Sequence, residues 1–119
     1  MARLKDASGL DRKLRSLKPF NKKCKLEVIG NINRPPMERS AATVELYKKA
    51  SAIAQQSGWK LEEAAVGGGS DGNFTAALGI PTLDGLGAVG EGAHSPNESI
   101  LISEIPRRTA LLARLIEAA

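Results

Sequence analysis

The sequence has 119 residues, which suits one domain with one hydrophobic core. No apolar run reaches the length of about 18 residues that a membrane helix requires, and the N-terminus lacks an apolar signal core, so we expect a cytoplasmic protein without membrane association. The single cysteine, Cys24, cannot form a disulfide within the chain, and we interpret it as a structural residue on a strand rather than a reactive thiol.

The net charge of +4 is concentrated near the N-terminus. Residues 1–25 hold nine Lys or Arg against two acids, whereas residues 26–119 hold eight against eleven. Phe20 is the only aromatic side chain in the basic stretch, and apolar residues recur there at helical spacing, at Leu10, Leu14 and Leu17. We therefore predict a helix over residues 3–17, stopped by Pro19, with a solvated basic face, and we expect no nucleic-acid partner.

Three stretches of the remaining chain predict strands. Residues 24–32 alternate between apolar and polar side chains as a half-buried strand does, with Gly30 marking a bulge. Residues 33–36 then break the pattern, and we place a crossing between two domains there. Shorter strands are predicted over residues 59–66 and 80–83.

Apolar spacing also predicts two further long helices. One runs over residues 41–57 and ends at Gly58, a suitable C-terminal cap, and the other begins near Pro106, which suits a first helical turn. A tight glycine loop and a short helix over residues 74–78 separate the two short strands. This order indicates a parallel strand–helix–strand unit.

The loop Gly67–Gly72 fits the pattern G-x-G-x-x-G, which raises the question of a dinucleotide site. The helix after it is short, and Asp84 follows Gly72 by twelve residues where the fingerprint requires about twenty. No lysine comes directly after Gly72, so the phosphate-cradling pattern is also absent. We disfavour a nucleotide site, and a glycine-rich turn without a ligand remains an alternative.

Two side chains are candidates for binding. His94, the only histidine, lies in a loop of small and polar residues, where a surface histidine and a metal ligand are both open. Arg34 precedes Pro35 and Pro36, whose fixed dihedrals hold the chain extended. A guanidinium mounted in this way suits two-point binding of a carboxylate, although an arginine in an interdomain hinge is the alternative.

Several motifs occur in one order along the chain, namely Arg34–Met37, Val66–Asn73, Gly79–Gly87, His94–Ser95 and Ile105–Arg108. Taken together they resemble the C-terminal third of glutamate carboxypeptidases. The same order is similar to that of acetylornithine deacetylase, succinyl-diaminopimelate desuccinylase and the aminoacylases. The similarity is strong over about residues 26–119 and weak before them.

The resemblance implies an α/β fold that forms the C-terminal part of a two-domain metallopeptidase. Residues 1–33 would end an inserted lid domain, through which such enzymes dimerise, and residues 34–119 would be an αβαβα segment of the catalytic domain. We therefore expect a homo-oligomer formed through the lid.

The resemblance also implies roles for individual residues. His94 corresponds to the last histidine that ligates one of two zinc ions, and Arg34 to the lid arginine that holds the free carboxylate of a small-molecule or peptide substrate. Gly68, Gly69 and Ser70 belong to the loop that borders this substrate.

The implied reaction is hydrolysis of an amide bond next to a free carboxylate, by a carboxypeptidase or an N-acyl amino acid deacylase. The family's other zinc ligands and its general base have no counterpart in this chain. We therefore expect at most weak zinc binding and no activity by the chain alone. The alternative is a non-catalytic module that self-associates or binds a partner through an uncovered sheet edge.

Overall fold

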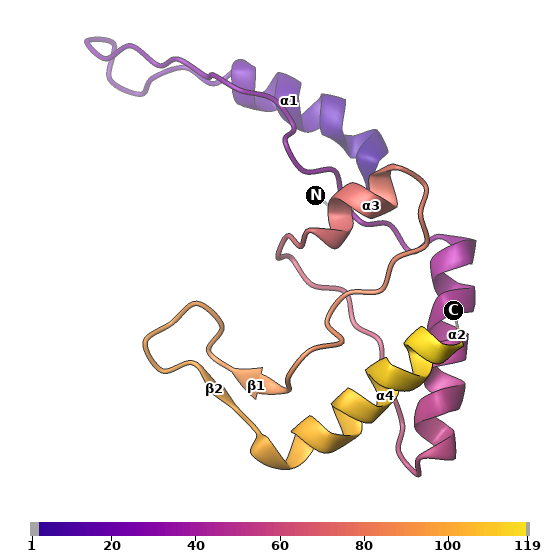
Figure 1. The fold of residues 1–119 in the computed structure, drawn as a ribbon. Helices are drawn as coiled ribbons and strands as arrows, with labels where there is room; N and C mark the ends of the chain where they lie inside the picture. The colour runs from indigo at the N-terminus through magenta and orange to yellow at the C-terminus, as the bar shows by residue number, and fades with distance from the viewer. Residues whose placement is uncertain (1–2, 119) are drawn as a thin grey trace. The chain divides into compact units, whose positions relative to one another are not determined.

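The computed structural model describes residues 3–118, which form helices and one small sheet (Figure 1). The elements in chain order are η1 (Leu4–Asp6), α1 (Ala7–Arg15), α2 (Ala41–Gln56), α3 (Gly72–Ala77), β1 (Gly90–Glu91), β2 (Ser99–Ile100), η2 (Ile102–Glu104) and α4 (Ile105–Glu117). They belong to two compact units. The first comprises the chain up to Arg39 together with Val66–Ile80, and the second comprises Ser40–Ala65 and the chain from Pro81 onward.

The first unit contains the predicted basic helix. η1 and α1 together cover residues 4–15, which confirms the helix predicted over residues 3–17. The Arg15 guanidinium donates to Asp11 one turn earlier, at 2.9 Å, and to the Gly30 carbonyl at 2.7 Å. The hydrogen bond to Asp11 and the negative charge of Asp11 raise the pKa of Arg15.

The second unit is built on α2 and α4, as the apolar spacing predicts. The Ser40 hydroxyl accepts the Thr43 amide at 3.1 Å and so caps the start of α2. Gly58 follows the end of α2 with a φ of +79°, a conformation in which glycine is not strained. Pro106 lies in the first turn of α4, where its missing amide hydrogen breaks no helical bond.

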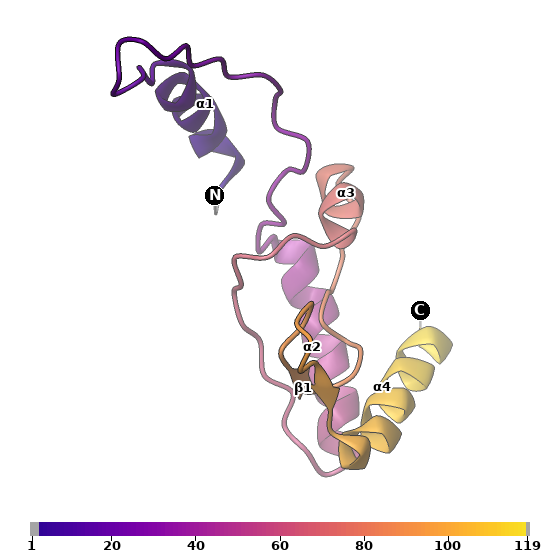
Figure 2. The same cartoon turned by 90° about the vertical axis from the view of Figure 1, so that its left-hand side faces the viewer.

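The core of the second unit lies where α4 packs beside α2, which Figures 1 and 2 both show. Ala50 and Ala54 of α2 are fully buried, and Leu111 of α4 is 2% exposed. The small alanine side chains let the two helices approach closely. The Tyr47 hydroxyl donates to the Leu61 carbonyl at 2.8 Å and holds the segment after α2 against the same core.

The three predicted strands are wrong. Residues 24–32, 59–66 and 80–83 form no strand, and Figure 1 draws them as plain trace. Alternating side chains favour a strand only where a neighbouring strand satisfies its amides and carbonyls, and within residues 3–118 none pairs with these segments. Cys24 is exposed as a consequence, so its predicted place on a strand is also wrong.

The sheet that does form is a hairpin that the sequence pattern did not predict. β1 and β2 pair antiparallel, with Gly90 opposite Ile100 and Glu91 opposite Ser99. A side chain at Gly90 would lie 2.0 Å from the Ser99 carbonyl oxygen, so only glycine fits there. Helices and strands together are compatible with the predicted α/β class, but the order αβαβα is not formed. None of the helices within residues 3–118 has the length and apolar character required to cross a bilayer.

Candidate functional site

The Arg34 side chain is held against α3 in the first unit. Its guanidinium carbon lies 4.9 Å from the centre of the Phe74 ring, which is the geometry of a cation–π contact. Pro35 and Pro36, which follow Arg34, are partly buried and fix the direction of the backbone. The arginine is thus mounted on a constrained chain and rests on an aromatic face, as a binding residue should be.

The glycine loop before α3 passes directly along the Arg34 side chain. A methyl group placed on Gly69 would lie 3.0 Å from Cδ and 3.4 Å from Nη1 of Arg34. A methyl group on Gly67 or Gly68 would meet nothing within 4 Å. Gly69 is therefore the position where the absence of a side chain lets the loop backbone approach the guanidinium.

Asn73 joins this loop to the segment that carries Arg34. Its side chain is buried, with the residue 9% exposed, and its Nδ2 donates to the Pro35 carbonyl at 2.7 Å. Its Oδ1 accepts the Ser70 amide at 2.8 Å, while the Ser70 hydroxyl accepts the Gly72 amide at 3.0 Å. The Ser70 amide is thus used within the loop, and its hydroxyl hydrogen remains a donor that a ligand can engage.

A carboxylate of the chain itself already contacts the guanidinium. Asp71 Oδ1 accepts from Arg34 Nη2 at 3.2 Å, across 37 residues of sequence. The Asp71 side chain is 96% exposed and that of Arg34 is 38% exposed. No sequence pattern assigned Asp71, Asn73 or Phe74 to the site, and the only signal for them was their place within or directly after the glycine loop.

His94 lies in the second unit, in the turn of the β1–β2 hairpin. Its φ of +67° makes it the one non-glycine residue with a positive φ among residues 3–118. Such a conformation costs about 1–3 kcal/mol and is often found at functional sites. The His94 amide donates to the Glu98 carboxylate at 3.2 Å, which holds the turn, and the imidazole is exposed.

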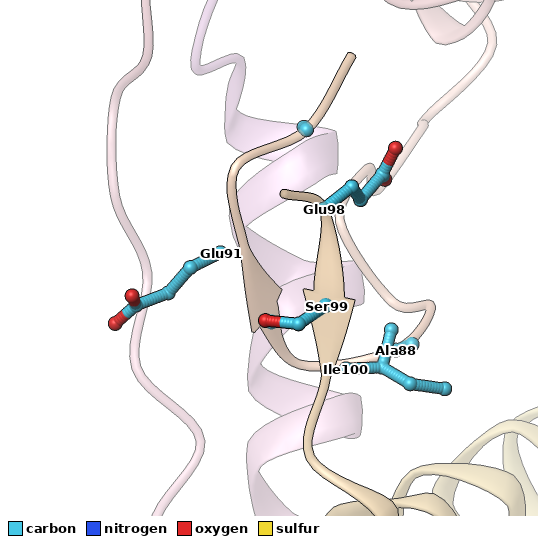
Figure 3. Close-up of a pocket in the computed structure, with 7 residues that line it drawn as sticks. Ala88, Glu91, Glu98, Ser99 and Ile100 are labelled. Atoms are coloured by element: carbon cyan, nitrogen blue, oxygen red, sulfur yellow. The ribbon is translucent and has the colours of Figure 1, made fainter. Parts of the chain in front are cut away.

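The hairpin does not assemble further metal ligands around His94. A hollow of about 290 Å³ is lined by residues of the hairpin, among them Glu91, Glu98 and Ser99 (Figure 3). Figure 3 shows the Glu91 and Glu98 carboxylates pointing to opposite sides of the hairpin. Within residues 3–118 no three His, Cys, Asp or Glu side chains converge, whereas a catalytic zinc usually takes three protein ligands. The residues present therefore do not fit a catalytic zinc site.

The structure thus brings together some of the predicted site residues. Arg34 and Gly69 are in contact, and Gly68 and Ser70 lie in the same loop of the first unit. His94 belongs to the second unit. The roles predicted for these residues remain predictions at this point, as does the domain boundary between residues 33 and 34.

Comparison with known proteins places the chain in a family of peptidases. Residues 6–118 match the model of peptidase family M20/M25/M40, and the chain belongs to this family. It is also similar to carboxypeptidase G2 from Pseudomonas sp. (strain RS-16), with 38% identity over 93 residues. That match covers 76% of this chain and 22% of the relative, so the chain spans about a fifth of the relative's length. The family resemblance found in the motifs is thereby confirmed.

Proposed function

We propose that this chain forms the carboxylate-binding part of a zinc metallohydrolase that cleaves an amide bond next to a free carboxylate. The observation that carries this proposal is the mounting of Arg34, between the Phe74 ring at 4.9 Å and the backbone at Gly69. A relative is named a carboxypeptidase, and a substrate of such an enzyme has a free C-terminal carboxylate. The substrate of an N-acyl amino acid deacylase also carries a free carboxylate.

The physical reason is that a guanidinium recognises a carboxylate through two parallel hydrogen bonds when its plane is fixed. An arginine on a flexible stem loses rotamer entropy on binding, about 0.5–1.5 kcal/mol for such a side chain. At Arg34 part of this cost is already met by the contact with Phe74 and the constraint of Pro35. Ser70 and the glycines of the loop would border the same ligand.

In this proposal the domain arrangement follows the family. Residues 1–33 end a lid domain through which two copies associate, and residues 34–119 are the C-terminal part of the catalytic domain. His94 contributes one zinc ligand to a site whose other ligands come from outside this chain. The 119-residue chain alone therefore binds zinc at most weakly and is inactive.

A second candidate function is a non-catalytic module that pairs with another copy. It is favoured by the apolar side chains in residues 24–32, because Leu26 is 45%, Ile29 84% and Ile32 43% exposed. The same segment alternates between apolar and polar side chains, and pairing with the backbone of a second copy would engage amides and carbonyls that no strand within residues 3–118 engages.

The test is made on the purified chain. Zinc is measured by elemental analysis, hydrolysis on a panel of N-acyl amino acids and glutamyl amides, and mass in solution by light scattering. We expect substoichiometric zinc and no hydrolysis, together with binding of a free-acid ligand that Arg34→Lys weakens. Tight zinc with chelator-sensitive turnover would contradict the predicted inactivity, and a stable dimer without any ligand binding would favour the module.

A further inference from the structure

We propose that Asp71 is an internal competitor that occupies Arg34 when no ligand is bound and must be displaced by an incoming carboxylate. This inference rests on the proposed role of Arg34 in carboxylate binding. It assigns a task to a side chain that neither hydrolysis nor metal binding explains.

The atom that Asp71 contacts is the one a ligand needs. Asp71 Oδ1 lies 3.2 Å from Nη2 of Arg34. A guanidinium binds a carboxylate at two points through one of two edges, which are formed by Nε with Nη2 and by Nη1 with Nη2. Nη2 donates one N–H at each of these edges. A ligand that takes either edge therefore competes with Asp71 for this nitrogen, and the negative charge of Asp71 repels it.

The contact between Asp71 and Arg34 is also weak enough for a ligand to break. Only one oxygen of Asp71 is engaged, and its side chain is 96% exposed. Within residues 3–118 this is the hydrogen bond and ion pair that the Asp71 side chain forms. Exposed pairs of this kind are weak, because water and salt screen the charges and the long side chain loses freedom in forming them. A ligand carboxylate with two hydrogen bonds replaces one bond by two.

Asp71 is not required to hold the arginine in place. The Phe74 ring and the loop backbone at Gly69 already confine the guanidinium, and Asn73 ties that loop to Pro35 through a bond of 2.7 Å. A carboxylate that positioned Arg34 would be expected to use both oxygens and to be buried. The geometry of Asp71 matches a displaceable occupant.

Arg34 selects ligands by charge, and Asp71 sets the affinity that a ligand must exceed to bind there. A carboxylate supplies two acceptors and a full negative charge, so it can displace Asp71, whereas the carbonyl of an ester or an amide supplies neither. Asp71 thus lowers the affinity of every ligand at Arg34 by a similar factor, about two- to fivefold, and the preference for a carboxylate comes from Arg34 itself.

The experiment uses the full chain and N-benzoylglycine as the probe, with its methyl ester for comparison, and follows the Arg34 Nε–H signal by NMR titration. We expect Asp71→Asn to bind the free acid about two- to fivefold more tightly than the unmodified chain. Asp71→Ala should behave in the same way, which separates loss of charge from any new contact of the amide. The gain should shrink at about 1 M salt, where charges are screened within about 3 Å.

Asp11→Asn is the matched control. It removes the same charge from the same unit and also breaks an Arg–Asp pair, that of Arg15 at 2.9 Å, so the affinity for the probe should not change. Unchanged or weaker binding in both Asp71 variants, while Arg34→Lys still weakens binding, would overturn the role of Asp71 alone. Binding that is unchanged in Arg34→Lys would overturn the proposed function itself.

Discussion

Arg34 and Gly69 lie so close together that a methyl group on Gly69 would come within 3.0 Å of Cδ of Arg34. This contact joins residues that are 35 positions apart in the sequence, and it brings the backbone of the glycine loop to the guanidinium. We therefore expect the proposed site to be sensitive to the addition of a single methyl group at Gly69.

Gly69→Ala should weaken binding of a free-acid ligand by about three- to tenfold, because the Arg34 side chain must shift away from its seat on Phe74. Gly67→Ala is the control, since a methyl group there meets nothing within 4 Å. Affinities from NMR titration measure both. Equal affinity in the two variants would show that the close approach at Gly69 has no part in binding.

Asn73→Asp should loosen the loop from the segment that carries Arg34. The new carboxylate keeps an acceptor for the Ser70 amide but loses the donor to the Pro35 carbonyl and places charge beside that oxygen. We expect a loss of about 1–3 kcal/mol in the local stability of the first unit. Amide hydrogen exchange of Ser70 measures it, and Asn31→Asp, at an exposed residue of the same unit, should leave the exchange rate unchanged.

Arg34→Lys should impair hydrolysis of free-acid substrates in a complete enzyme that contains this segment, because lysine keeps the charge but loses the planar fork. Losses of about 2–5 kcal/mol apply to desolvated contacts, and since Arg34 is 38% exposed we expect the lower end of that range. The ratio of kcat/KM for a free acid to that for its methyl ester is the measurement. The same loss on both substrates would remove Arg34 from the carboxylate site.

Leu111→Ala should destabilise the second unit by about 2–4 kcal/mol, since Leu111 is 2% exposed between α2 and α4 and its removal leaves a cavity. Leu112→Ala, at a neighbouring leucine that is 44% exposed, should cost less than about 1 kcal/mol. Urea denaturation followed by circular dichroism distinguishes them. Equal midpoints would mean that α4 does not pack on α2 through Leu111.

His94→Ala should lower zinc occupancy and activity together in a complete enzyme, if the imidazole supplies a ligand as proposed. His94→Gly should lower both as well, but the hairpin should be as stable as before or more so, because glycine adopts the φ of +67° without strain. Elemental analysis and thermal unfolding measure the two effects. Full zinc occupancy with unchanged turnover in either variant would remove His94 from the metal.

The local sequence by itself determined the helices and the family. α1, α2 and α4 follow from apolar residues at helical spacing and from end signals such as Gly58 and Pro106, and these act within one or two turns. The family motifs are likewise readable along the chain, since each is a short run in a fixed order. The mounting of Arg34 before two prolines was predictable for the same reason.

Only the tertiary structure decided which segments became strands and which side chains meet Arg34. Residues 24–32 alternate correctly, yet a strand exists only where another backbone pairs with it, and that depends on distant parts of the chain. Asp71 contacts Arg34 across 37 residues, and Asn73 contacts Pro35 across 38 residues. These contacts could not be predicted from local sequence patterns. The spacing of residues along a helix or strand indicates which face of that element each residue occupies. Which residues contact that face depends on the path that the rest of the chain takes in the fold.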